Sequence, residues 1–238
     1  MRWSQATDIG WVRPVNEDSL CVCPDLGLFA VADGMGGRQA GEVASRLAIQ
    51  ELEHFLRSCA DSQVDTGSVL GEGVQKTNKL VYRMSFKNGE CRGMGTTLSC
   101  VVIRDNQLCL AHVGDSRIYL LQQGKIIQLT EDHSVVQKMQ KEGAITKEEA
   151  FHHSYRHVLT RALGVEAEVE VDVARLTLHP KDVILLCTDG LSGCLDEEEM
   201  RDIVYNAADL EQAVDLLVHS ALTRGGTDNV SVILVAVD

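Results

Sequence analysis

The sequence lacks the features that usually mark a nucleic-acid-binding protein. Aromatic residues make up only 4% of it, the formal net charge is -13, and no run of Lys or Arg is present. Binding to a phosphate backbone depends on clustered positive charge, and binding to single strands depends on aromatic stacking. We therefore expect no nucleic-acid partner. An acidic protein that acts on a phosphorylated substrate would need metal ions to reverse its field locally.

Membrane and secretion signals are also missing. No apolar stretch approaches the ~20 residues of a membrane span, and the N-terminus, M-R-W-S-Q-A-T-D, has no hydrophobic region typical of a signal peptide. The 8 cysteines form no C-x-x-C pair, and several lie inside apolar runs. We interpret them as reduced thiols rather than a disulfide framework. We expect a cytoplasmic protein with no membrane partner.

What is present is typical of an ordinary globular chain. Its 238 residues, 45% of them hydrophobic, suit one domain with a sizeable core, although two small domains stay possible. No repeat, low-complexity segment or Pro/Gly/Ser linker divides it. We predict a single domain over residues 1–238.

Apolar spacing predicts the order of the elements. Helical spacing indicates helices over about 41–56, 68–84, 135–142, 196–207 and 209–224, and a short helix opened by Thr146. Asp132 or Ser134 can cap the helix over 135–142, Thr146 with Glu149 resembles a capping box, and Asp196 with Glu199 opens the helix over 196–207. Strand-like runs occupy about 28–32, 96–103, 108–113, 117–122, 125–129, 166–178, 183–188 and 230–237, besides the first residues. We interpret the four strands between 96 and 129 as one meander. Helices in consecutive pairs and strands in consecutive groups favour antiparallel sheets covered by helices.

Four aspartates stand at the ends of these apolar runs. Asp33 and Asp189 close two of them and are each followed by Gly, Asp115 follows a third, and Asp228 precedes the last. Asp beside Gly is ordinary turn chemistry when it occurs once. Together the four suggest one shared site for hard cations. An all-oxygen ligand set suits Mg²⁺ or Mn²⁺, and no H-E-x-x-H zinc motif is present.

Two such ions that share one carboxylate would lower the pKa of a water between them, which makes hydroxide available for in-line attack on a phosphoryl group. Asp33 is the natural bridging ligand, because the Gly34 carbonyl can add to one ion. Asp189 and Asp228 would complete the second ion. The turn residues of the loop 13–18 indicate that its charged side chains project from it.

In order along the chain, these segments resemble the metal-dependent serine/threonine protein phosphatases of type 2C in their compact bacterial form. The matching segments are V-R-P-V-N-E-D at 12–18, V-A-D-G-M-G-G at 31–37, G-T-T-L at 95–98, V-G-D-S-R-I-Y at 113–119, L-T-E-D-H-S at 129–134, L-T-R-A-L-G at 159–164, L-L-C-T-D-G-L at 185–191 and G-G-T-D-N-V-S at 225–231. Each segment alone is weak evidence for the family, whereas the ordered set is highly specific and spans nearly the whole chain.

The resemblance implies an α+β fold, a four-layer sandwich of two antiparallel sheets flanked by pairs of antiparallel helices. It also implies hydrolysis of phosphoserine and phosphothreonine by direct attack of water, without a covalent phosphoenzyme. The substrates would be phosphorylated proteins, among them targets of a Ser/Thr kinase and the kinase itself. Nothing in the sequence suggests an obligate dimer, so we expect a monomer.

Roles for individual residues follow from the same resemblance. It places Asp33 as the metal bridge, the Gly34 carbonyl on one ion, and Asp189 and Asp228 on the other. Glu17 and Asp18 would hold waters on the metals, Arg13 would bind the substrate phosphate, and Asp115 would hold a weaker third ion. A solvated loop is the alternative for Arg13 and Glu17, and a structural turn is the alternative for Asp115.

Two residues depart from the family pattern, so the identity of the general acid is open. Met35 stands where animal members carry a histidine, and Arg38 stands where many bacterial relatives do. A metal-bound water or a histidine of the flap, the segment 135–158, could donate the proton instead.

Structural roles are favoured for the histidines. For the flap histidines, surface or flap packing is favoured over direct catalysis; they are His152, His153 and His157. We expect His112 to be a hydrogen-bonded core histidine and His133 to support the turn after Asp132.

Three other functions compete with this interpretation. The first is a phosphatase of the same fold dedicated to one phosphorylated regulator, and the second is an inactive member that only binds a partner. The intact Asp33, Asp189 and Asp228 argue against inactivity. A nucleotide-binding enzyme is the third, but the G-x-x-x-x-G-K motif is absent.

Overall fold

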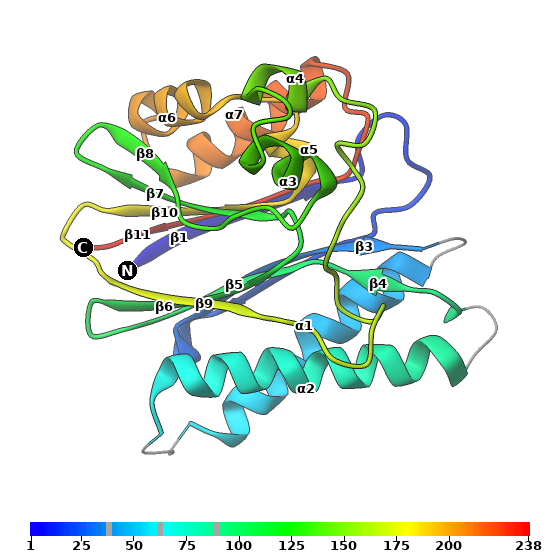
Figure 1. Cartoon of the computed structure of the whole chain (residues 1–238). Coiled ribbons are helices and arrows are strands. Elements are labelled where there is room, and N and C mark those ends of the chain that lie inside the picture. The colour runs from blue at the N-terminus through cyan, green and yellow to red at the C-terminus, as the bar shows by residue number, and fades with distance from the viewer. Residues whose placement is uncertain (37–39, 61–63, 88–90) are drawn as a thin grey trace.

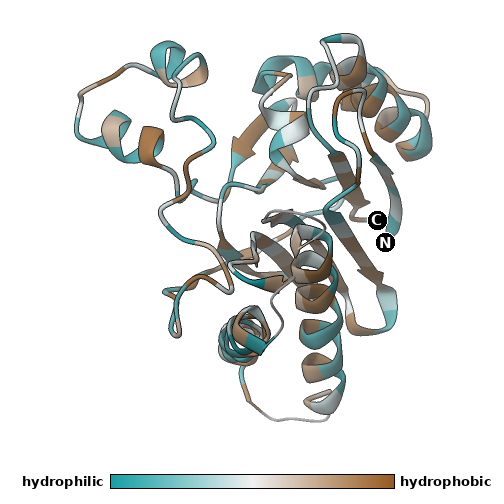
Figure 2. Ribbon diagram, turned by 90° about the vertical axis from the view of Figure 1, so that its right-hand side faces the viewer, coloured by the Kyte–Doolittle hydropathy of each residue, from teal (hydrophilic) through white to brown (hydrophobic). Residues whose placement is uncertain are grey.

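The longest apolar runs become strands that are buried on both faces. In β3 (Leu28–Met35), Leu28 and Ala30 pack toward helices, whereas Phe29 and Val31 pack toward the opposite sheet. This follows from the two-residue period of a strand, which sends alternate side chains to opposite faces. A computed structural model of the chain describes residues 1–36, 40–60, 64–87 and 91–238. Its strands carry most of the hydrophobic colour in the middle of the molecule (Figure 2).

The described strands form two antiparallel sheets that lie face to face (Figure 1). One sheet has the order β1-β11-β10-β7-β8, and the other has the order β2-β3-β5-β6-β9, with the short β4 paired to β3. The first sheet consists of β1 (Arg2–Asp8), β7 (Arg117–Gln122), β8 (Lys125–Gln128), β10 (Val183–Cys187) and β11 (Val230–Ala236). The second consists of β2 (Asp18–Cys23), β3, β4 (Gly95–Thr96), β5 (Leu98–Arg104), β6 (Gln107–Val113) and β9 (Asp172–Thr177).

Helices cover the outer face of each sheet. The pair α1 (Ala40–Ser58) and α2 (Thr66–Lys87) packs on the second sheet, and α6 (Glu197–Asn206) and α7 (Leu210–Thr223) lie over the first (Figure 1). Separate apolar layers fill the space between the sheets and beneath each helix pair. The predicted four-layer sandwich of two antiparallel sheets flanked by helix pairs is confirmed.

Three of the remaining helices are short and lie toward the same end of the sandwich (Figure 1). They are α3 (Val135–Lys141), α4 (Lys147–Phe151) and α5 (Asp189–Ser192), whereas the 3₁₀ turn Pro24–Leu26 connects β2 to β3 at the opposite end. Ser134 caps α3, and Thr146 with Glu149 forms a capping box on α4, as does Asp196 with Glu199 on α6. The predicted helix starts are therefore right, and of the two candidate caps for α3, Ser134 rather than Asp132 is used.

The predicted four-stranded meander is wrong. β5 and β6 pair in one sheet, but β7 and β8 pair in the other. The chain changes sheets after Val113, where Gly114 takes a φ of +116° and passes so close to Thr97 that a Cβ would come within 2.6 Å of it. Hydrophobic alternation is the same whichever sheet a strand joins, so the pattern did not reveal the crossing.

Two strand boundaries also differ from the prediction. The expected strand over 166–178 shortens to β9, and Val173 is exposed while Val169 and Val171 pack on the core before the strand begins. This is an edge strand with one pairing partner. Asp33, expected after the end of a strand, lies inside β3, which continues to Met35.

Two further predictions concern the cysteines and membrane-spanning helices. The 8 cysteines are free thiols. Over the ranges that the structure describes, no helix is both long and apolar enough to cross a bilayer. Arg38 and Gly37 lie outside those ranges.

Candidate active site

Two carboxylates face each other across neighbouring strands. Asp18 of β2 is the register partner of Asp33 of β3, and like charges placed directly opposite on a sheet repel. Burial raises the pKa of Asp33 well above its usual range, and the charges of Asp18 and Asp189 raise it further. Burial likewise raises the pKa of Asp18 to about 7, against the lowering effect of hydrogen bonds, one of them the 2.8 Å bond from Thr188 Oγ1. The pair therefore favours a neighbouring cation.

The backbone of Asp33 is held from the G-T-T-L segment. Its N–H donates to Thr97 Oγ1 at 2.8 Å, and its carbonyl accepts from the Thr97 N–H at 2.9 Å and from Thr96 Oγ1 at 2.8 Å. Thr97 Oγ1 lies 2.6 Å from Ser116 Oγ, beside Asp115. Sequence reasoning gave these hydroxyls no role, although they fix the central carboxylate.

Asp189 and Asp228 come from adjacent strands of the other sheet. Asp189 opens α5 directly after β10, and Asp228 stands just before β11. Gly190 allows this close approach, because a Cβ there would lie 1.9 Å from the Asn229 carbonyl oxygen. Burial acts to raise the pKa of Asp189, but the hydrogen bond and charge of His157, together with a hydrogen bond with Asp33 and the charge of Arg13, lower it below its usual value.

The loop 9–17 is tied to this pair by Asn229. The Asn229 amide accepts from the Glu17 N–H at 2.8 Å and donates to the carbonyls of Ile9 at 2.9 Å and Val15 at 3.1 Å. The loop presents Arg13, whose Nη2 lies 2.7 Å from Asp228 Oδ2. Arg13 and Glu17 therefore reach the acidic residues of the site. Asn229 holds their loop in place, a role that the sequence segment containing Asn229 did not predict.

Gly34 sits where no side chain fits. A Cβ at Gly34 would lie 2.1 Å from the Gly41 carbonyl oxygen and 2.6 Å from that of Glu17. Burial raises the pKa of the Glu17 carboxyl, while a hydrogen bond from the Gly41 N–H lowers it. The start of α1 and the loop before β2 therefore close on the backbone at Gly34.

Asp115 lies on the crossing between the sheets and is almost fully buried. The preceding Gly114 is fixed from both sides by His133: its carbonyl accepts from the His133 N–H at 2.7 Å, and its N–H donates to His133 Nδ1 at 3.1 Å. Burial, followed by the charge of Asp189, raises the pKa of Asp115 well above its usual range. The structure thus brings all the predicted acidic residues to one end of the sandwich.

Two of the carboxylates contact basic side chains of the chain itself. Arg13 pairs with Asp228, and His157 Nδ1 lies 3.2 Å from Asp189 Oδ2. In the described ranges, no three His, Cys, Asp or Glu side chains converge on one point as metal ligands. Two of the acids instead turn toward basic side chains, which satisfies one oxygen of each.

The donor set nevertheless suits a hard divalent cation. Asp18 Oδ1 and Asp189 Oδ1 are buried and have no hydrogen-bond partner among the described residues, and a buried carboxylate oxygen without a partner is costly. The acids Asp33 and Asp115 have raised pKa values because they lie near other carboxylates and away from water. Oxygen ligands of this kind are those that Mg²⁺ and Mn²⁺ select.

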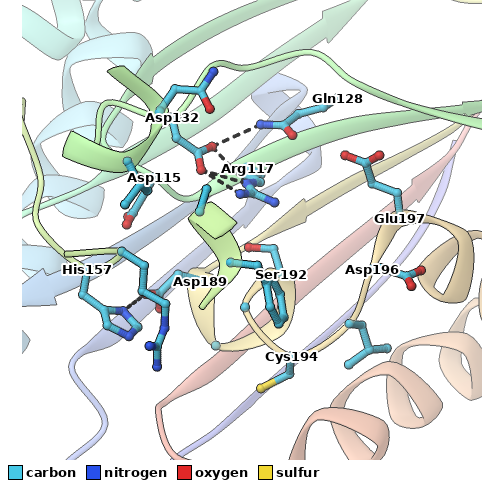
Figure 3. Close-up of a pocket in the computed structure, with 18 of the residues that line it drawn as sticks. Asp115, Arg117, Gln128, Asp132, His157, Asp189, Ser192, Cys194, Asp196 and Glu197 are labelled. Carbon is cyan, nitrogen blue, oxygen red and sulfur yellow. Dashed lines mark hydrogen bonds and ion pairs between the residues drawn. The ribbon is translucent and has the colours of Figure 1, made fainter. Parts of the chain in front are cut away.

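A cavity of about 640 Å³ opens beside these carboxylates. Asp115, Asp189, Asp228 and Arg13 line one end of it, while Asp18 and Asp33 lie outside its lining. Figure 3 shows His157 directed at Asp189 on that side, and Asp196 and Glu197 on the opposite side. The volume exceeds what a phosphoserine side chain fills.

The flap histidines differ in what they touch. Within the described part of the chain, His157 is the one that contacts the acidic cluster. His152 stacks edge-on against Phe151, and His153 lies beside Tyr155. Met35 directs its methyl toward Gly95, where an added Cβ would come within 2.6 Å of it.

Of the two interior histidines, one behaves as expected. His112 is fully buried with Nδ1 2.8 Å from Ser99 Oγ and Nε2 3.0 Å from the Glu131 carbonyl oxygen, and burial lowers its pKa to about 4. His133 was expected to support the turn after Asp132; its ring instead accepts from the Gly114 N–H, at the crossing between the sheets, and lies 3.2 Å from Asp172.

A half-buried ion pair in the lining of the cavity was not predicted. Arg117 donates to Asp132 through Nε at 2.9 Å and 3.1 Å and through Nη2 at 2.7 Å, and its Nη1 donates to Tyr119 Oη at 3.0 Å (Figure 3). Gln128 adds a further donor to Asp132 at 3.1 Å. Asp132 was considered only as a helix cap.

Comparison with known proteins identifies the family. The sequence profile of the family Protein phosphatase 2C matches residues 14–229. This chain belongs to that family. It is 39% identical over 236 residues to the serine/threonine phosphatase stp of Listeria welshimeri, covering 96% of this chain and 93% of the relative. It is 35% identical to the protein phosphatase PhpP of Streptococcus pneumoniae, covering 100% and 98%.

Solved structures of 2C phosphatases have the same fold. The serine/threonine phosphatase PstP/Ppp of Mycobacterium tuberculosis superimposes with a TM-score of 0.92 at 37% identity, covering 100% of this chain and 98% of that one. The catalytic domain of PstP in complex with 2 manganese ions superimposes with a TM-score of 0.89 at 37% identity and the same coverage. These proteins share the whole sandwich with this chain.

Proposed function

We propose that this chain is a Mg²⁺- or Mn²⁺-dependent protein phosphatase that hydrolyses phosphoserine and phosphothreonine. The observation that carries the proposal is the set of aspartates from both sheets at one end of a cavity, in a member of the 2C family. Relatives of similar length are serine/threonine phosphatases, and one solved relative holds 2 manganese ions.

Individual residues would hold the ions as follows. Asp33 would be shared between two ions, with the Gly34 carbonyl on one and Asp189 and Asp228 on the other. Such ions lower the pKa of a water and neutralise charge on a phosphoryl group when bound. Asp18 and Glu17, which lie beside Asp33 and Gly34, would accept hydrogen bonds from coordinated waters.

The remaining site residues act on the substrate or on a weaker ion. Asp115, at the crossing between sheets, would hold the third ion. Arg13 is half-exposed at the mouth of the site and presents a planar fork of donors suited to a phosphate. Met35 has no proton to transfer, so a solvent molecule or His157 would protonate the leaving oxygen.

We also propose the setting in which the enzyme works. Its substrates would be proteins phosphorylated by a Ser/Thr kinase, and we include that kinase among them. The free thiols support a reducing compartment, which we take to be the cytoplasm. We propose that it acts as a monomer, because its carboxylates and cavity all come from one chain.

Release of phosphate from a phosphothreonine peptide tests the function. We expect release with Mn²⁺ and none with excess chelator. Asp33→Asn and Asp189→Asn should each lower kcat by at least about a hundredfold while the circular dichroism spectrum is unchanged. Arg13→Ala should instead weaken substrate binding. Turnover in chelator, or full activity of both aspartate variants, would contradict the site; no turnover by the wild type would favour a partner-binding module.

A further inference from the structure

The cavity continues well beyond the carboxylates, between the flap and the start of α6. We call this part the side groove and define it by six residues that line it: Val136, Ala150, Phe151, Leu195, Glu197 and Met200. It joins the end that contains Asp189 without a break, since one cavity includes both. A polypeptide whose phosphorylated side chain reaches the aspartates would therefore place neighbouring residues over the side groove.

The walls of the side groove are apolar. Leu195 and Met200 are essentially fully buried, Val136 and Ala150 are nearly so, and Phe151 of α4 is 46% exposed. Such walls suit the aliphatic part of a side chain rather than a bare charge.

The floor of the cavity has its charges paired within the protein. Asp132 receives hydrogen bonds from Arg117 and from Gln128, and Arg117 also donates to Tyr119. Because these polar groups are hydrogen-bonded to one another, the charged side chains that a ligand would contact are those at the rim.

The rim carries charged side chains of both signs. Glu131, Asp196 and Glu197 line the opening together with Arg156, and Lys147 of α4 places its Nζ 3.0 Å from Glu197 Oε2. The Lys147 side chain is 73% exposed and that of Glu197 is 31% exposed. The contact between Lys147 and Glu197 shows that the rim accommodates a cation at the end of a flexible aliphatic chain. Lys147 reaches Glu197 from the flap side.

We propose that the side groove binds an arginine or lysine of the substrate next to the phosphorylated residue, with the aliphatic stem on the apolar walls and the cation on Glu197. The proposal rests on the phosphatase function proposed above, and it adds a preference of the enzyme for a basic residue next to the phosphorylated residue of the substrate. Lys147 competes with the substrate cation for the same carboxylate, so it weakens the preference that Glu197 creates.

Phosphothreonine peptides that carry Arg, Ala, Leu or Glu at one flanking position at a time test this directly. With Mn²⁺, the wild type should show a kcat/KM about fivefold higher for Arg than for Ala at one flanking position, as expected for an ion pair at a partly exposed rim. Glu197→Gln should reduce this ratio to about one, and Lys147→Ala should increase it. The ratio is taken within each variant, so a general loss of activity cancels.

Glu198→Gln is the matched control. Glu198 lies in the same turn of α6 with the same charge, but it is exposed and does not line the cavity, so its ratio should equal that of the wild type. Equal rates for Arg and Ala, a preference for Leu or Glu, or an unchanged ratio in Glu197→Gln would each overturn the proposal while leaving the phosphatase function intact. Failure of every peptide, and of p-nitrophenyl phosphate, would instead disprove the phosphatase function.

Discussion

Replacing Asp18 by asparagine should make the metal-free protein more stable at alkaline pH. Burial beside Asp33 raises the pKa of Asp18 to about 7, against about 3.9 in an unfolded chain. Three pKa units correspond to about 4 kcal/mol of folding free energy, which is an upper limit for what the carboxylate costs. The new amide keeps an oxygen for Thr188 Oγ1 but places its NH₂ group where Asp18 Oδ1 has no partner, and that costs about 1–3 kcal/mol. The net gain should be about 1–3 kcal/mol.

The sign of the stability difference between Asp18→Asn and the wild type depends on pH. A carboxyl whose pKa is raised by folding is protonated in both states below about pH 4, so it costs nothing there. As the pH rises, the unfolded chain ionises first and the free energy of unfolding falls, until the folded state also ionises near pH 7. Asp18→Asn should therefore be less stable than the wild type at about pH 4, by the roughly 1–3 kcal/mol that the unpaired amide costs, and more stable than the wild type at about pH 8.

Urea unfolding in chelator at both pH values measures this difference. Asp215→Asn, on the exposed face of α7, is the control and should leave stability unchanged at both. Addition of Mn²⁺ at about pH 8 should then stabilise the wild type more than Asp18→Asn, because a cation that binds only the folded state offsets the repulsion. A variant that is no more stable than the wild type at alkaline pH in chelator would refute the reasoning.

Two further changes should lower stability. Asp132→Asn removes the charge that pairs with the half-buried Arg117 and should cost about 3 kcal/mol in urea unfolding. This is the lower end of the range for buried pairs, because Arg117 is 26% exposed; a loss below about 1 kcal/mol would show that water already satisfies the guanidinium. Gly190→Ala forces a Cβ to within 1.9 Å of the Asn229 carbonyl, so β10 and β11 must separate locally, and we expect a loss of about 1–3 kcal/mol together with weaker Mn²⁺ binding by calorimetry. Unchanged binding would mean that the shift does not reach Asp189 and Asp228.

Local patterns in the sequence predicted the parts of this structure that local physics decides. Helix starts at Thr146 and Asp196 were predicted because a capping box needs only residues three apart. Asp33 and Asp189 were singled out because each follows an apolar run whose side chains are buried, where a carboxylate beside glycine is conspicuous.

What the sequence did not reveal depends on contacts between distant segments. The turn at Gly114 separates β6 and β7 into different sheets, and only its fit against Thr97 shows why. The Arg117–Asp132 pair and the approach of His157 to Asp189 join residues that share no spacing rule. Neither a periodicity nor a turn signal encodes such pairs.

The position of the aspartates explains how the fold tolerates them. Asp18 and Asp33 belong to one sheet, whereas Asp189 follows β10 and Asp228 precedes β11 of the other. A continuous apolar layer, which includes Phe29 and Ile184, packs the two sheets face to face. Because that layer is close-packed, the sheets cannot move apart to relieve the repulsion between the acids. The same rigidity that makes the carboxylates destabilising also keeps them in place for a cation, so this end of the sandwich is expected to trade stability for function.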